Sequence, residues 1–100
     1  MQTTKIENEL KRALYPDPRF AQAFLLEQEP FCWELVVLAS VGFKYGLLRE
    51  LSVLAFEIQR RIPRGVISVL LFGRGEFVKQ AFASRFGSGI KIKGEGNGTD

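Results

Sequence analysis

One stretch of the chain, residues 46–72, decides which fold class the sequence predicts: it reads GLLRELSVLAFEIQRRIPRGVISVLLF. Its first part places leucine and isoleucine at intervals of three and four, which predicts an amphipathic helix over 46–62. Pro63 and Gly65 end that helix. The following run, Val66–Phe72, is short, β-branched and almost wholly apolar, as a central strand is. We therefore expect a helix followed at once by a buried strand.

The run before this helix, Phe31–Phe43, is rich in β-formers and apolar on both alternating faces. This pattern predicts a strand covered on both sides, and a buried helix is the alternative because periodicity does not separate the two. Two strands joined by a helix favour parallel pairing through a right-handed crossover. The apolar run also indicates a homo-oligomer that associates through its sheet or its first helices.

The segments before this run complete an element order of α-α-β-α-β-α-β. Thr4 and Glu7 match a capping box that starts a first helix. Asp17 and Pro18 are suited to start a second helix, which Pro30 ends. We expect these two helices to cover the face of the sheet opposite the connecting helix.

After the second strand, residues 76–86 fit a further helix, and Ile90–Lys93 alternates as an exposed edge strand does. We predict one α/β domain over residues 1–93. It has a small three-stranded, mostly parallel sheet with helices on both faces, and an α+β arrangement is the alternative. Residues 94–100 are Gly-rich and polar, and we expect a disordered tail there.

The composition excludes several classes of protein. With 100 residues, 46% of them hydrophobic, the chain can bury one core and is neither a disordered chain nor a disulfide scaffold. It has no histidine and a single cysteine, so a cysteine-based zinc site and an intrachain disulfide are excluded. No Ser-His-Asp, Cys-His or paired-carboxylate arrangement can be assembled. We expect no enzyme activity, no cofactor and no metal.

Two polar residues lie inside the apolar run. Cys32 is expected to be a small buried hydrophobe, since a reactive thiol needs a positive and partly exposed setting. Glu34 is expected to point outward or to pair with a basic residue; a buried functional acid is the alternative.

The sequence also predicts where the protein is found. The N-terminus is polar, and no apolar run reaches the roughly 18–20 residues that a membrane span needs. We expect a cytoplasmic protein without a membrane segment.

Basic residues are concentrated in the last third of the chain. The net charge is +3, yet residues 60–93 hold eight basic side chains and one acidic side chain, Glu76. Three of the basic residues lie at the C-terminal end of the long helix; they are expected at the end of the sheet opposite the turn after the second strand and would assist in contacting phosphates. The other five are predicted to share one face. The five are Arg74, Lys79, Arg85, Lys91 and Lys93, and the three are Arg60, Arg61 and Arg64.

The predicted basic face indicates contact with the phosphates of DNA or RNA. The sequence therefore favours a small non-enzymatic nucleic-acid-binding or regulatory module. A solvated surface without a partner and an acidic protein partner are the alternatives for the charges. A protein–protein adaptor or small inhibitor that uses aromatic and basic residues is the alternative function.

The turn that reads Phe72-Gly73-Arg74-Gly75-Glu76 has two interpretations. It is either a tight turn or a cradle of backbone amides for a phosphate, although the third glycine of a dinucleotide fingerprint is absent. The order of elements from Lys44 to Lys93, with this turn, resembles that of small chromatin proteins of the Alba type. The resemblance covers half of the chain, and the two leading helices depart from that family.

Overall fold

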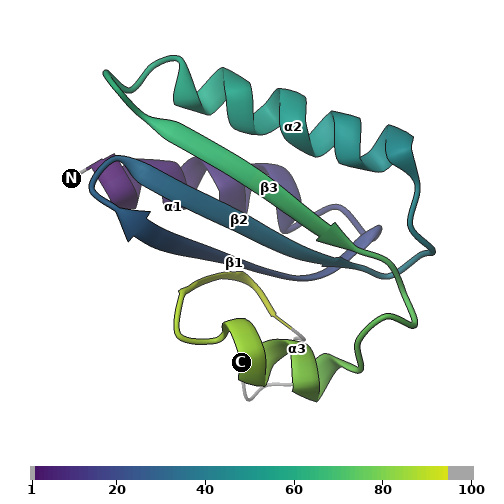
Figure 1. Ribbon diagram of the computed structural model, residues 1–100. Coiled ribbons are helices and arrows are strands. Elements are labelled where there is room, and N and C mark those ends of the chain that lie inside the picture. The colour runs from purple at the N-terminus through teal and green to yellow at the C-terminus, as the bar shows by residue number, and fades with distance from the viewer. Residues whose placement is uncertain (1, 95–100) are drawn as a thin grey trace.

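Four strands form one sheet in the computed structural model, which describes residues 2–94 (Figure 1). Helices lie against both faces of the sheet, so the α/β fold and the two-sided covering expected from the sequence are confirmed. In chain order the elements are α1 (Gln2–Leu14), β1 (Phe20–Glu29), β2 (Cys32–Ala39), α2 (Tyr45–Gln59), β3 (Val66–Phe72), α3 (Lys79–Phe86) and β4 (Ile90–Lys93).

The strands are arranged in the order β3-β2-β1-β4. β2 and β3 run parallel, with Cys32 opposite Val66 and Leu38 opposite Phe72, which confirms the pairing expected across the connecting helix. β1 pairs antiparallel with both β2 and β4. The sheet is therefore mixed and has four strands, where the sequence predicted three. β3, expected at the centre, lies at one edge.

The segment predicted as a second helix contains β1 instead. Its apolar residues do recur at helical spacing, as Phe20 and Phe24 show, and its alanine, leucine, glutamine and glutamate residues favour helices. Pairing with a strand on each side overrides this local preference. Pro30 and Phe31 form the turn into β2, and Phe31 has a φ of 68°. Proline here opens a hairpin turn and does not end a helix.

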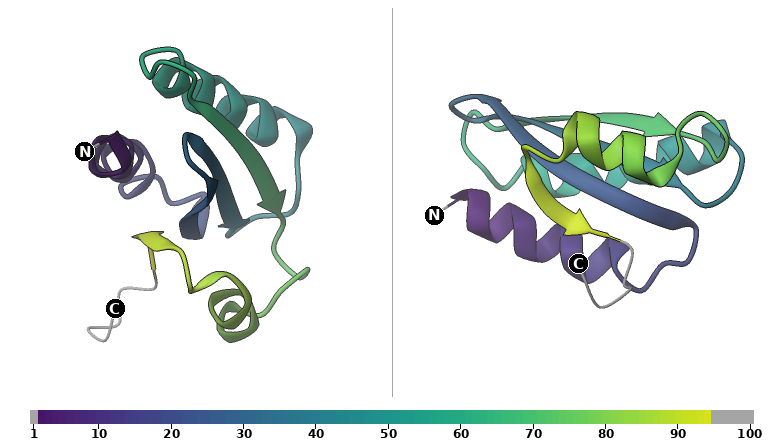
Figure 2. Two further views of the ribbon diagram at one scale, coloured as in Figure 1. Left: turned by 60° about the vertical axis from the view of Figure 1, so that its left-hand side comes forward. Right: turned by 90° about the horizontal axis from the view of Figure 1, so that it is seen from below.

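Helices lie on both faces of the sheet in Figure 2, and each face carries its own apolar cluster. α1 and α2 share one face, where Leu10 and Leu51 belong to the same core as Leu35 of β2. α3 covers the other face, where Phe82 packs with Phe24. The prediction that α1 lies opposite α2 was wrong. An apolar helical stripe shows that a helix is covered, but not by which face of the sheet.

Element boundaries differ from the prediction in several places: the run predicted as a strand over Phe31–Phe43 forms β2 only over Cys32–Ala39, and two helices start at other residues. α1 begins at Gln2, so Thr4 lies inside the helix and is not its N-cap. α3 begins at Lys79, because residues 73–77 form the preceding turn. β3 and β4 have the bounds predicted from the sequence. Of the predicted tail, residues 95–100 lie outside the described residues. Within residues 2–94, no helix has the length and apolar character to cross a bilayer.

Candidate functional site

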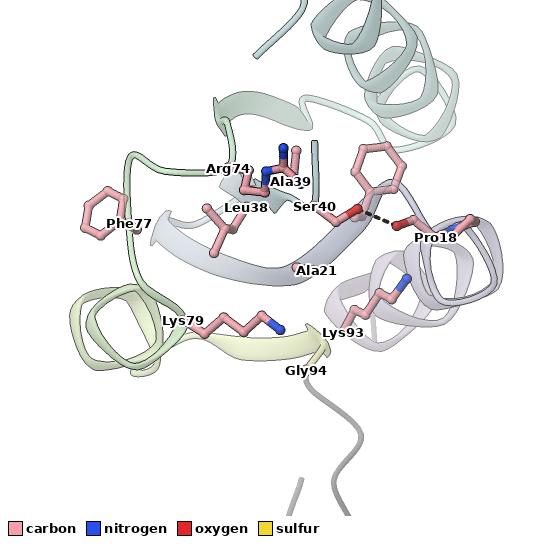
Figure 3. A pocket seen from close by; sticks show the side chains of 11 residues that line it. Pro18, Ala21, Leu38, Ala39, Ser40, Arg74, Phe77, Lys79, Lys93 and Gly94 are labelled. Atoms are coloured by element: carbon pink, nitrogen blue, oxygen red, sulfur yellow. Dashed lines mark hydrogen bonds between the residues drawn. The ribbon is translucent and has the colours of Figure 1, made fainter. Parts of the chain in front are cut away.

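A cavity of about 410 Å³ opens at the end of the sheet where β2 and β3 finish (Figure 3). The segments around it are the start of β1, the end of β2, the turn after β3, the start of α3 and the end of β4. This volume falls within the range of roughly 300–1,000 Å³ typical of small-ligand pockets. The cavity is lined by Pro18, Phe20, Ala21, Leu38, Ala39, Ser40, Arg74, Phe77, Lys79, Lys93 and Gly94.

Three basic side chains from three different segments line this cavity. Arg74 comes from the turn after β3, Lys79 is the first residue of α3, and Lys93 is the last residue of β4. Figure 3 shows Arg74 and Lys79 on opposite sides of Leu38 and Ala21. No aspartate or glutamate of residues 2–94 belongs to the lining. The cavity is therefore positively charged and suited to an anion.

Hydrogen bonds from its backbone amides hold the turn that carries Arg74 in place. The amide of Arg74 donates to the carbonyl of Val41 at 2.7 Å, and the amide of Gly73 donates to the Glu76 carboxylate at 2.6 Å. A Cβ on Gly73 would collide with the backbone of Phe43. Because these groups are already bonded within the protein, the tight-turn interpretation holds. Of the turn's amides, those of residues 73, 74 and 76 have partners in the chain and cannot cradle a phosphate.

Lys93 also caps the C-terminal end of α1. Its Nζ donates to the carbonyl oxygens of Leu14 at 3.2 Å and Asp17 at 2.6 Å. A cation at this position complements the negative end of the helix. Lys93 thus adds positive charge to the cavity, which Arg74 and Lys79 line as well.

The rest of the cavity wall is mainly apolar. Phe77 is half-buried and packs edge-on against Phe72, with ring centroids 4.9 Å apart. Next to the wall, Gln22 of β1 pairs with Leu38 and is only 6% exposed, and its Oε1 has no hydrogen-bond partner. A buried acceptor without a partner costs free energy, on the order of 1–3 kcal/mol.

The other five predicted site residues lie elsewhere. Lys91 borders a separate surface hollow with Lys11 and Tyr15, and Arg85 lies over the ring of Phe86 at 5.5 Å. At the opposite end of the sheet, Arg60 pairs with Glu57 at 2.9 Å, Arg61 pairs with Glu9 at 2.7 Å, and Arg64 occupies the turn before β3. The structure thus brings together three of the eight.

Sequence reasoning missed several residues of the cavity wall. Phe20 and Ala21 were assigned to a helix, and Ser40 and Phe77 carry no motif. The available signal was the short turn that brings Arg74 close to the start of the next helix. Because β1 was not recognised as a strand, the walls could not be placed.

The sequence predicted the surroundings of two residues of β2, Cys32 and Glu34. Cys32 is partly exposed, so the prediction that it is buried was wrong. Glu34 accepts a hydrogen bond from Gln28 at 3.2 Å on the exposed surface, which confirms that it points outward.

A second polar cluster connects α1, β1 and α2. Arg19 bridges Asp17 at 2.7 Å and Glu50 at 2.9 Å. Hydrogen bonds from Arg19 lower the pKa of Asp17 and of Glu50, and the two carboxylates raise the pKa of Arg19. These groups are satisfied by one another, so the cluster holds three elements together.

Among residues 2–94, no three potential metal ligands are grouped together. Comparison of the chain with protein-family models, with curated proteins and with solved structures gives no match.

Proposed function

We propose that this protein is a small non-enzymatic module that binds single-stranded nucleic acid, taking a phosphate group in the cavity between Arg74 and Lys79. One observation carries the proposal: basic side chains from separate segments line a single cavity, and no residue of 2–94 contributes a carboxylate to its lining. We also propose, from the sequence, that the protein is cytoplasmic.

The apolar wall supports a single strand over a duplex. Phe77 and Phe20 line the same cavity as the basic residues. A base that is unstacked from its neighbours can lie against an aromatic ring while its phosphate is held by cations. A duplex presents its phosphates but keeps its bases stacked inside. We therefore expect single strands to bind more tightly than the matching duplex.

The direct test is the fluorescence anisotropy of a labelled single-stranded oligonucleotide, titrated at several salt concentrations. The double variant Arg74→Gln/Lys79→Gln should bind at least roughly tenfold more weakly, about 1.4 kcal/mol. It should also lose about 0.7 from the salt slope, since one phosphate contact to a single strand contributes about 0.7. The matched control Lys5→Gln/Arg12→Gln removes the same charges from the exposed surface of α1 and should keep most of the affinity.

Two results would contradict the proposal. The first is no binding at low salt, and the second is an equal loss in both double variants, which would indicate attraction to net charge alone. Binding to an acidic protein that persists at high salt and requires Phe77 would favour the adaptor interpretation.

A further inference from the structure

The outer edge of β3 has backbone groups that are open for pairing. The amide of Val66 donates to the carbonyl of Phe31 in the neighbouring chain segment at 2.8 Å. Because peptide groups alternate along a strand, residues 67, 69 and 71 direct theirs away from β2. The Ile67 amide is capped by Oε1 of Gln59 at 2.8 Å. Within residues 2–94, no other strand lies on this side of β3, which leaves Val69 and Leu71 open.

This edge lacks the features that usually prevent pairing. β3 reads VISVLLF, with no charge and no proline, and its register with β2 is unbroken. The opposite edge of the sheet, β4, is short and carries Lys91 and Lys93. Native edge strands are normally protected by such lysines, by proline or by bulges. On the face that carries α3, Val66 and Leu70 remain 48% and 38% exposed.

An uncharged stripe of α2 adjoins this edge. The bond from Gln59 to β3 identifies which side of the helix faces the edge. Residues three, four or seven positions apart share that side, and here they are Tyr45, Leu48, Ser52 and Phe56. Tyr45 is 81% exposed and Phe56 is 57% exposed. Of the charged residues of α2, Arg49 borders this stripe, and Glu50 and Glu57 lie on the other sides of the helix.

We propose that β3 pairs antiparallel with β3 of a second copy of this chain, forming one continuous sheet with the two α2 stripes in contact. The partner must offer an open, uncharged strand edge with a mostly apolar helix stripe beside it, and this chain has both. Antiparallel pairing also places Arg64 of each copy at the other copy's Gly73–Glu76 turn, where Glu76 provides the opposite charge. The contact is two-fold and self-complementary.

The Gln59 cap determines the register. If the cap on Ile67 is kept, Val69 pairs with Leu71 of the second copy. Leu70 then lies opposite Leu70 of the second copy, at a site without ladder hydrogen bonds where Cα atoms are about 4.5 Å apart. In the same register, Ser68 lies opposite Phe72, and the two Ser68 residues are separated by roughly 14 Å along the strands.

Disulfide formation tests both the pairing and its register. In a Cys32→Ser background, Leu70→Cys should form a covalent dimer rapidly under mild oxidation, because its Cα separation suits a disulfide. The matched control is Ser68→Cys, which is exposed on the same face and should remain largely monomeric. Equal cross-linking of both, cross-linking of Ser68→Cys alone, or none by either variant would overturn the proposal.

A second measurement needs no cysteine. Sedimentation of the unmodified chain at roughly 100 μM should show a dimer, since a micromolar dissociation constant gives mostly dimer there. Leu70→Lys should shift it to monomer with unchanged circular dichroism. Val53→Lys is the matched control, because Val53 is exposed on α2 outside the stripe and should leave the dimer intact. A monomeric unmodified chain, or an equal effect of both variants, would overturn the proposal.

Discussion

At the scale of single residues, Gly73 shows how one missing Cβ positions the candidate site. Its backbone lies against that of Phe43, and any larger side chain would collide there. The turn can therefore pass close to the segment after β2, and Arg74 is held beside Val41. The glycine provides close backbone approach here; a positive φ in this turn occurs at Gly75.

We expect Gly73→Ala to reduce the free energy of unfolding by about 2 kcal/mol or more, because the colliding atoms belong to backbone. Urea denaturation measures this change. The matched control is Gly46→Ala in α2, where an added Cβ meets nothing within 4 Å. That control should be stabilised by roughly 0.5–1 kcal/mol, since alanine favours helix interiors. A Gly73→Ala variant as stable as the parent chain would contradict the account of the turn.

At the scale of elements, α3 depends on a small aromatic cluster. Phe82 is fully buried and contacts Phe24, Phe72, Phe77 and Phe86, with ring centroids 5.0 to 6.1 Å apart. α3 is short, and isolated helices of this length are marginal in water. The cluster therefore keeps α3 on the sheet and Lys79 at the cavity.

Phe82→Ala should destabilise the protein by roughly 3–5 kcal/mol, as large aromatic truncations in a core do. Hydrogen exchange should show the amides of α3 losing protection before those of β2. Phe56→Ala, at an exposed position of α2, should lower the stability of the monomer by much less. Retained protection of α3 in Phe82→Ala would show that other contacts hold the helix.

At the scale of the whole molecule, the first helix and the last strand of the described chain meet. β4 pairs with β1 and lies next to α1, and Lys93 donates to two carbonyls at the end of α1. The first helix and the last strand therefore stabilise each other, and they are far apart in sequence. The candidate cavity lies beside this junction, between Pro18 and Gly94.

We expect Lys93→Met to lower the free energy of unfolding by roughly 1.5–3 kcal/mol, because it removes charged hydrogen bonds. Loss of amide protection in the last turn of α1 should accompany this effect. Lys5→Met, at an exposed position of the same helix, should change stability by less than about 0.5 kcal/mol. If the two variants behave alike, Lys93 does not hold the end of α1.

The sequence by itself determined α2, β3, β4 and the parallel pairing of β2 with β3. Each of these elements is short or strongly periodic and ends at a clear breaker, so local pattern and connection length were sufficient. Part of the candidate site could also be predicted, because Arg74 and Lys79 are close in sequence and separated by one turn. Lys93 was predicted with them and does line the cavity.

Only the tertiary structure decided that residues 20–29 form β1, that α1 and α2 share a face, and where the cavity lies. The apolar residues of β1 satisfy helical spacing as well as a strand, so its conformation depends on pairing with β2 and β4. β4 is distant in the chain, and the residue pattern of 20–29 alone does not show which segments will pair with it. The cavity walls come from five segments, and their meeting follows from the sheet order alone.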